Sequence, residues 1–347
     1  MTQDRPASIL FLCDFDPGFS GAKHHTVGVG GTEAMIVVLS EALAARGVNV
    51  TVATRIDQEE RNHVRYQPID AARPREADVT VVVKQWSDVA IDAGPVRVFL
   101  ATDVHVPDPQ MIGRCLGWCT KAVALSPFMR AKLQAVAPAA GMGIFSPPIA
   151  LGDYSSLDEE RRSVLLYCSV PDRGLYYMKD LFPAIRRRVN DATLVITSDF
   201  TLWGRAPAKD AFLRFFERQA GVEYLGHVDR HRLIAEQRRA RVFAYPCTFE
   251  EGFCIAAAEC MAAGAVPVTT NAFALTTTVG DAGILIDGRP RSWFYRRRFV
   301  KAVTELLSDD EKWLARSRAC RGRAQDYGAA TAAERFLSGI EGRGSAV

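Results

Sequence analysis

Two carboxylates with seven residues between them, Glu251 and Glu259, mark the segment FEEGFCIAAAE, residues 249–259. Glu251 precedes a glycine in a stretch typical of a loop, whereas Glu259 lies in an alanine-rich run typical of a buried helix. An unpaired carboxylate in such a helix would cost several kcal/mol. Vicinal hydroxyls are one natural partner, because each carboxylate oxygen can accept one O–H. A nearby arginine is the other, and the spacing alone leaves both interpretations open.

The backbone beside these carboxylates is suited to a phosphate. The run RVFAYP predicts a strand, so the residues after it lie at the carboxyl edge of a sheet, where open α/β sheets bind ligands. The helix expected over residues 255–263 is stopped by Gly264 and presents free N–H groups at its start. The residues expected at that start are Gly252, Phe253 and Cys254.

A second loop, CSVPDRGLYYMKD, follows another predicted strand. Arg173 and Gly174 fall just before a predicted helix, so a cation meets a helix N-terminus. This arrangement suits a diphosphate leaving group, whose developing charge needs stabilising in the transition state. A solvated loop arginine is the alternative.

The elements that must position these residues form a repeated alternation of short apolar runs and longer amphipathic runs. Strands that are apolar on both faces belong in a parallel sheet covered by helices. The sequence predicts strands at 8–13, 48–54, 78–83, 96–102, 164–168, 192–198, 222–226, 241–246 and 265–270. It predicts helices at 32–47, about 175–189, 255–263 and 329–340.

A proline-rich break at residues 146–148 indicates a connection between two domains. We therefore expect two doubly wound α/β domains, 1–147 and 148–326, with a C-terminal helix in 327–347 that packs back toward the first domain. A length of 347 residues fits this division, and the cleft between the domains is the expected ligand site.

The composition excludes several classes of protein. A net charge of +3 gives no reason to expect a nucleic-acid partner, and no apolar run approaches the roughly 18 residues of a membrane span. The eight cysteines are scattered, which favours reduced, structural thiols. With no recognisable signal peptide, the expectation is a cytoplasmic protein, with a peripheral association at the inner membrane face left open.

The run YPCTFEEGFCIAAAECMAAGAVPV resembles the nucleotide-sugar motif of retaining glycosyltransferase family 4 (group 1), which has the GT-B fold of two Rossmann-like domains facing a cleft. In that family the second glutamate holds the ribose hydroxyls of the nucleotide and the first contacts the donor sugar. The resemblance assigns these roles to Glu259 and Glu251.

The family usually carries two cations in the loop that holds Arg173. One is an early arginine, and about that place this chain has Tyr167. The other is a lysine before the glycine, replaced here by Arg173. Lys179 is the candidate for the second cation.

Further positions are implied by the same resemblance. The segment GVGGTEA is similar to a loop that meets the donor phosphates, and ATDVHVPD falls where a histidine touches the donor sugar. VEYLGHV ends a strand where the base would lie. The residues concerned are Gly30 and Gly31 for the phosphates, Asp103 and His105 near the reacting carbon, and Gly226, His227 and Val228 for the base.

Two other patterns have competing interpretations. Asp14-Phe15-Asp16 has the form of a metal-binding Asp-x-Asp motif, but it directly follows the first strand, and we expect no metal. RPRSWFYRRRFVKAV, residues 289–303, interleaves aromatic residues with arginines. It predicts either a helix with a solvated basic face or a helix that contacts an anionic membrane surface.

The resemblance implies transfer of a sugar from a nucleotide diphosphate sugar, such as a UDP- or GDP-sugar, to a hydroxyl acceptor, with retention of configuration and without cofactor or metal. Glycan, lipid-linked, small-molecule and protein acceptors all stay open. A non-catalytic nucleotide-sugar-binding protein of the same fold is the main alternative. An NAD(P)-dependent oxidoreductase is disfavoured because the loop before Gly28 is too long for a tight dinucleotide turn.

Overall fold

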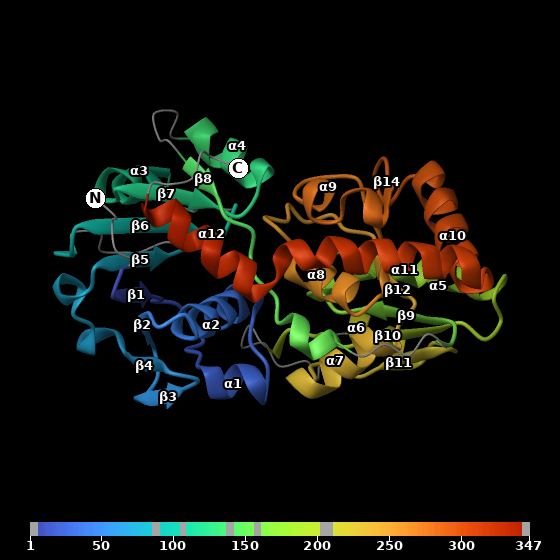
Figure 1. The fold of residues 1–347 in the computed structure, drawn as a ribbon. Coiled ribbons are helices and arrows are strands. Elements are labelled where there is room, and N and C mark those ends of the chain that lie inside the picture. The colour runs from blue at the N-terminus through green and yellow to red at the C-terminus, as the bar shows by residue number, and fades with distance from the viewer. Residues whose placement is uncertain are drawn as a thin grey trace. The chain divides into compact units, whose positions relative to one another are not determined.

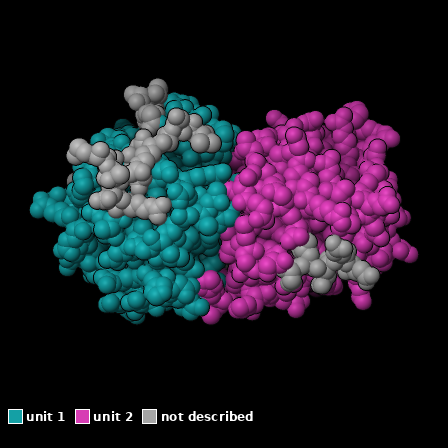
Figure 2. Space-filling view, in the orientation of Figure 1, with its two compact units in different colours: residues 1–24, 29–148, 327–347 teal, residues 25–28, 149–326 magenta. Residues whose placement is uncertain are grey.

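A computed structural model describes residues 6–84, 91–104, 109–136, 142–155, 161–201 and 211–341. The chain divides into two compact units, drawn in different colours in Figure 2. The first comprises residues 1–24, 29–148 and 327–347, and the second comprises residues 25–28 and 149–326. Each unit is built on one sheet with helices packed on it (Figure 1).

The first sheet has eight strands in the order β3-β4-β2-β1-β5-β6-β7-β8. All its pairings are parallel except that of β3 with β4. Every residue of β5 is buried, as expected for a strand covered on both faces. The strands are β1 (Ser8–Leu12), β2 (Asn49–Thr54), β3 (Glu59–Arg61), β4 (Val64–Pro68), β5 (Val79–Val83), β6 (Val96–Ala101), β7 (Lys121–Ala124) and β8 (Met142–Ile144).

The second sheet has six parallel strands in the order β11-β10-β9-β12-β13-β14. Its central strands are buried along their whole length. The strands are β9 (Val164–Tyr167), β10 (Thr193–Ile196), β11 (Val222–Tyr224), β12 (Val242–Tyr245), β13 (Val266–Thr270) and β14 (Ile284–Ile286).

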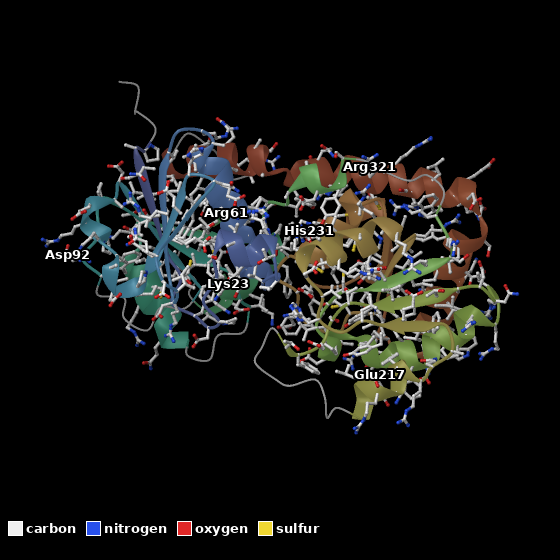
Figure 3. The ribbon with its side chains drawn as sticks, turned by 90° about the horizontal axis from the view of Figure 1, so that it is seen from below. Lys23, Arg61, Asp92, Glu217, His231 and Arg321 are labelled. Carbon is white, nitrogen blue, oxygen red and sulfur yellow. The ribbon has the colours of Figure 1, made fainter. Side chains whose placement is uncertain are left out.

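Helices cover these sheets. In the second unit α10 packs against α5 and α11, and α8 packs against α7 and α11. Figure 3 shows the second sheet between a layer with His231 and Arg321 and a layer with Glu217. The helices are α1 (Gly21–His25), α2 (Gly31–Ala44), α3 (Pro109–Trp118), α4 (Pro127–Val136), α5 (Leu175–Arg186), α6 (Ala211–Glu217), α7 (Arg230–Arg239), α8 (Ile255–Ala262), α9 (Leu275–Thr278), α10 (Trp293–Ser308), α11 (Asp310–Ala324) and α12 (Ala329–Glu341).

The strand order fixes where each sheet can bind a ligand. In the second sheet β9 lies between β10 and β12, so the connections leave it in opposite directions. In the first sheet β1 occupies the same kind of position between β2 and β5. Loops that follow such neighbouring strands diverge and leave a crevice, which is the usual ligand site of a doubly wound sheet.

The last helix returns to the first unit. α12 packs against α2, and the ring of Phe336 stands 6.0 Å from that of Phe11 and 5.4 Å from that of Phe145. Glu334 accepts a hydrogen bond from Arg46 at 2.5 Å. The residues that end the chain therefore complete the core of the unit that begins it.

The predicted α/β class with two doubly wound parallel sheets is confirmed. The antiparallel edge formed by β3 was not predicted, because EER is too short and too polar to indicate a strand without its partner β4. No helix in the described ranges combines the length and the apolar composition of a bilayer span.

Candidate active site

An arginine, a glutamate and a tyrosine meet at the point where the second sheet reverses its order. Arg173 ends a short 3-10 turn after β9, Tyr245 ends β12, and Glu251 follows six residues later. Glu251 Oε1 accepts hydrogen bonds from Tyr245 Oη at 2.5 Å and from Arg173 Nη1 at 3.2 Å. The two loops that we expected to bind the donor are thus joined by a direct ion pair.

Burial and neighbouring charges determine the protonation of Arg173 and Tyr245. Burial by itself would lower the pKa of Arg173. The charge of Glu251, its hydrogen bond, and the neighbouring Tyr245 and Cys254 together outweigh burial, so the pKa is raised and the guanidinium stays protonated. Burial and the charge of Glu251 both raise the pKa of Tyr245, which keeps its hydroxyl a donor. The Arg173 guanidinium also lies over the Phe249 ring, 4.1 Å from its centre, and its side chain is 21% exposed.

One oxygen of Glu251 remains for a ligand. Both side-chain hydrogen bonds reach Oε1, and within the described part of the chain none reaches Oε2. An ionised carboxylate has about four acceptor positions, so Oε2 can accept from a hydroxyl while Oε1 stays bound to the protein. The cluster can therefore hold a sugar hydroxyl beside a cation that faces the solvent.

Gly174 sets the position of Arg173. Its φ of +146° belongs to a conformation that side chains rarely adopt. A Cβ there would stand 2.3 Å from the carbonyl oxygen of Pro246, so the turn after β9 touches the backbone after β12. The Thr248 N–H donates to the Arg173 carbonyl at 3.1 Å and locks the two loops together.

Glu259 pairs with an arginine inside the fold. It is only 6% exposed, and its Oε1 accepts from Arg230 Nη1 at 2.7 Å while its Oε2 accepts from Gln237 Nε2 at 3.1 Å. Arg230 also donates to Asp153 at 3.0 Å and to the Tyr154 hydroxyl at 3.3 Å, and that hydroxyl donates to Gln237 at 2.7 Å. The structure therefore shows the arginine partner, which is one of the two interpretations that the sequence left open.

This ring of hydrogen bonds explains how the carboxylate can be buried without a ligand. A buried ion pair offsets its desolvation better when its remaining polar groups are also bonded. Gln237 donates to Glu259 and the Tyr154 hydroxyl accepts from Arg230, whereas Arg230 Nε has no partner among the described residues. Each oxygen of Glu259 accepts one bond within the described residues and keeps room for one more. A pair of hydroxyls can thus bind Glu259 without displacing Arg230.

The predicted base-contacting loop is held by a carboxylate that the sequence did not reveal. Asp199, in the loop after β10, accepts from the His227 N–H at 3.0 Å. Gly226 takes a φ of +65°, and a Cβ there would be 3.1 Å from Asp199 Oδ2. The backbone at Gly226, His227 and Val228 is therefore fixed in place at the carboxyl edge of the sheet.

The segment before α8 is tightly turned. Cys254 precedes the helix with φ +76°, a left-handed conformation that costs a non-glycine residue about 1 kcal/mol or more. The Phe253 carbonyl accepts from the Thr278 hydroxyl at 2.6 Å. Gly252 is half-buried, whereas Phe253 and Cys254 are buried.

The two positions considered for a second cation have different surroundings. Tyr167, which stands where the resemblance places an early arginine, is buried and donates to the Val170 carbonyl at 2.9 Å. The Lys179 ammonium lies 4.2 Å from the centre of the Phe215 ring and 5.5 Å from that of Tyr176. Lys179 thus sits on an aromatic surface formed by α5 and α6.

The first unit places its candidates around the start of α2. Gly30 caps this helix and Gly31 begins it, and the Glu33 carboxylate folds back so that a Cβ on Gly30 would be 2.4 Å from its Oε2. Asp103 pairs with Lys84 at 3.2 Å. Burial raises the pKa of Glu33, and the charge of Lys84 opposes that rise. His105 lies outside the described residues.

The carboxylates of the Asp-x-Asp pattern both pair with an arginine. Arg55 donates to Asp14 at 2.7 Å and to Asp16 at 3.0 Å. Among the residues that the structure describes, no group of three or more His, Cys, Asp or Glu side chains is arranged to hold a metal ion.

The part of the chain that holds this site matches a known protein family. Residues 162–309, which contain Arg173, Glu251 and Glu259, match the family model "Glycosyl transferases group 1". The second unit carries a group 1 glycosyltransferase domain. The resemblance seen in the sequence is therefore confirmed, and it rests on the domain that holds the paired loops.

Relatives of the group 1 domain extend the comparison. A GDP-mannose-dependent alpha-(1-6)-phosphatidylinositol monomannoside mannosyltransferase of Mycobacterium tuberculosis is 29% identical over an alignment of 262 residues that covers 66% of this chain. The match spans about 65% of that relative's own length.

Solved structures support the GT-B fold. The sucrose-phosphate synthase of Thermosynechococcus elongatus aligns with a TM-score of 0.74 and 17% identity, over 97% of this chain and 98% of that one. Anabaena HepE in complex with UDP-glucose aligns with a TM-score of 0.72 and 14% identity, over 96% and 99% of the two chains. At these identities the likeness establishes the fold alone.

Several residues around the candidate site gave no signal in the sequence. Arg230, Gln237 and Asp199 lie 22 to 29 positions away from the residues they hold, and they belong to no motif. Tyr245 could have been found, because it lies near the end of the predicted strand that leads into the glutamate pair.

Proposed function

We propose that this protein transfers a sugar from a nucleoside diphosphate sugar to a hydroxyl acceptor, with retention of anomeric configuration and without a metal ion. The observation that carries the proposal is the Arg173–Glu251 pair at the switch point of a group 1 domain. It sets a protonated guanidinium next to a carboxylate oxygen that can accept from a hydroxyl.

Arg173 and Glu251 divide the chemistry between them. The guanidinium stabilises the charge that develops on the diphosphate as its bond to the anomeric carbon breaks. Glu251 Oε2 orients the sugar through a hydroxyl. The acceptor oxygen forms its bond on the same face of the sugar, and its proton passes to the departing diphosphate. No protein nucleophile is required in this scheme.

The nucleotide is held by the rest of the second unit. We assign the ribose hydroxyls to the open acceptor positions of Glu259, and the base to the backbone of residues 226–228, which Asp199 fixes. The N–H groups at the start of α8, after Gly252, Phe253 and Cys254, assist Arg173 with the diphosphate. Lys179 is assigned to the same nucleotide site.

The first unit supplies further candidates for binding the donor. Gly30 and Gly31 give the N-terminus of α2 a backbone that can approach the phosphates. Asp103 and His105 are assigned to the sugar, and the remaining surface of this unit to the acceptor. A glycan or lipid-linked acceptor is suggested by the mycobacterial relative, whose name specifies a phosphatidylinositol mannoside.

Two donors should be tested first. The mycobacterial relative is named for its dependence on GDP-mannose, and HepE was solved with UDP-glucose. We propose to record the melting temperature of the purified protein with GDP, UDP, ADP and TDP, in EDTA and in magnesium. Stabilisation by one nucleotide in EDTA is expected, because a ligand of the folded state raises the melting temperature by mass action.

The matching nucleotide sugar should then be turned over in EDTA, and the anomeric configuration of the product determined by NMR. Retention without metal supports the proposal. Inversion, or turnover only with magnesium, contradicts it.

A non-catalytic binding protein is the second candidate, and one observation favours it. Tyr167 is buried where the resemblance expects an arginine, so the diphosphate loses one cation. A nucleotide sugar that raises the melting temperature but is neither transferred nor hydrolysed would establish this alternative.

A further inference from the structure

The first two turns of α10 carry an exposed face of aromatic and basic side chains. Trp293 is 61% exposed and Phe294 is 70% exposed, and their ring centres are 5.0 Å apart. Arg297 and Arg298 follow one turn later, both exposed, and the Arg297 guanidinium lies over the Trp293 ring at 5.4 Å. The helical period places all four on one side of α10.

The opposite side of α10 accounts for its folding. Tyr295, Phe299, Val303 and Leu306 are buried, and Arg296 pairs with Asp180 of α5. Packing in the core therefore needs neither Trp293 nor Phe294. Exposing two large aromatic rings side by side is costly in water, and such patches usually mark an interaction surface.

The charge around these rings has one sign. Residues 289–298 include five arginines and no acidic residue. Arg289, Arg291, Arg297 and Arg298 are exposed, and no acidic side chain in the described part of the chain pairs with them. This cluster adjoins the positive end of the helix dipole, where cations are unfavourable.

The next helix has the opposite arrangement of charges. α11 has Asp310 and Glu311 in its first turn and Arg321 and Arg323 in its last turn, which is the order that the dipole favours. α10 has no acidic residue in its first turn. An anionic partner that covers the arginines would remove this local cost.

We propose that the N-terminal part of α10 docks the protein on an anionic lipid surface. Trp293 and Phe294 enter the interfacial layer, where aromatic rings partition favourably, and the four exposed arginines contact lipid phosphates. Adjacent aromatic side chains at a helix tip, flanked by arginines, fit this layered environment. The inference rests on the start of α10 and the residues just before it, and does not depend on the donor site.

The test is sedimentation of the full chain with vesicles of phosphatidylcholine containing 30% phosphatidylglycerol, and with vesicles of phosphatidylcholine alone. We expect binding to the anionic vesicles that weakens in 0.5 M salt, because exposed charges are then screened. Arg297→Gln/Arg298→Gln should bind about 25-fold more weakly, at about fivefold per arginine. Trp293→Ala/Phe294→Ala should bind the anionic vesicles at least about tenfold more weakly.

Two controls separate docking from general effects. Arg214→Gln/Arg318→Gln removes the same two charges from exposed positions of α6 and α11 and should change binding less than about threefold. Every variant should keep the stabilisation by nucleotide that the parent protein shows. Trp293→Phe should still bind, but should lose the blue shift of tryptophan emission that the parent shows on vesicle addition.

Other results would overturn the proposal. Equal binding to both vesicle types, or binding that survives in both α10 double variants, would show that this face is not the docking site. Binding of a single-stranded RNA oligonucleotide in place of vesicles, lost in the same variants, would assign the patch to nucleic acid.

Discussion

At the scale of single residues, Glu259 has one role that the structure shows and one that we propose. The ion pair with Arg230 satisfies the buried carboxylate within the protein. The proposed contact with ribose would use the acceptor positions that remain. Because one side chain serves both, its deletion alone cannot tell them apart.

Glu259→Ala should lower the free energy of unfolding of the second unit by about 3 kcal/mol, since it leaves Arg230 buried with Asp153 as its remaining carboxylate partner. Arg230→Met/Glu259→Met should recover most of that loss, because apolar side chains of similar size replace buried pairs at little cost. Calorimetry checks the stabilities. If the double variant folds and binds nucleotide as the parent does, the ribose assignment is refuted; a loss of at least tenfold agrees with it.

Arg173→Ala should reduce kcat by about 10²- to 10³-fold, as expected for removal of a group that stabilises charge in the transition state. The kcat of Arg173→Lys should fall between those of Arg173→Ala and the parent, because lysine keeps the charge but loses the forked donors. The matched control is Arg214→Gln, an exposed arginine on α6. Steady-state kinetics with the identified donor would measure the effect, and an unchanged kcat in Arg173→Ala would contradict the assignment.

At the scale of elements, the site depends on how closely two loops approach. The turn after β9 lies against the backbone after β12 at Gly174, and only a residue without a side chain fits there. The sequence shows the glycine beside the arginine. The close approach to the Pro246 carbonyl, which requires a glycine there, arises because β9 pairs with β12.

Gly174→Ala should therefore destabilise the second unit by about 2–4 kcal/mol, from backbone strain together with the clash against Pro246. Gly280→Ala is the matched control. Gly280 also has a positive φ, of +54°, but nothing lies within 4 Å of its added Cβ. It should cost about 1 kcal/mol. Thermal unfolding of both variants tests the difference, and equal losses would argue against a clash.

The start of α2 predicts a dependence on pH. Burial raises the pKa of Glu33 in the folded state. The protonated side chain therefore contributes fully to the free energy of unfolding below the unfolded pKa of about 4.3, and this contribution is lost as pH rises through the folded pKa. Glu33→Gln removes this titration. The variant should match the parent near pH 4 and exceed its stability at pH 8. Melting curves across that range would check it, and a difference independent of pH would refute it.

At the scale of the whole molecule, the chain begins and ends in the same unit. α12 supplies Phe336 to a cluster with Phe11 and Phe145, residues that lie far from it in sequence. The stability of the first unit thus depends on a helix that follows the second unit in the sequence.

Phe336→Ala should lower the stability of the first unit by about 3–5 kcal/mol, the usual cost of deleting a buried aromatic ring. In differential scanning calorimetry, nucleotide should raise the melting temperature of the second unit. Phe336→Ala should lower the melting temperature of the first unit. Phe216→Ala, also fully buried but in the second unit, is the control and should show the opposite pattern. A single transition affected equally by both substitutions would show that the units unfold together.

Much of this protein could be predicted from local patterns. Apolar runs such as VTVVV predict strands covered on both faces, and Gly264 stops the helix that carries Glu259, because periodicity and backbone freedom are properties of neighbouring residues. The whole run YPCTFEEGFCIAAAECMAAGAVPV, with its loop, helix, glycine and strand, carried the resemblance that indicated the group 1 domain. The glutamates were found because they belong to one continuous segment.

The partners of those glutamates were decided only by the tertiary structure. Arg230 reaches Glu259 from α7, Arg173 reaches Glu251 from the loop after β9, and Asp199 holds the backbone of His227. Each contact depends on which strands and helices lie side by side, and strand order is set by long-range packing. A sequence determines that a buried carboxylate needs a partner, whereas the folded chain determines which residue it is.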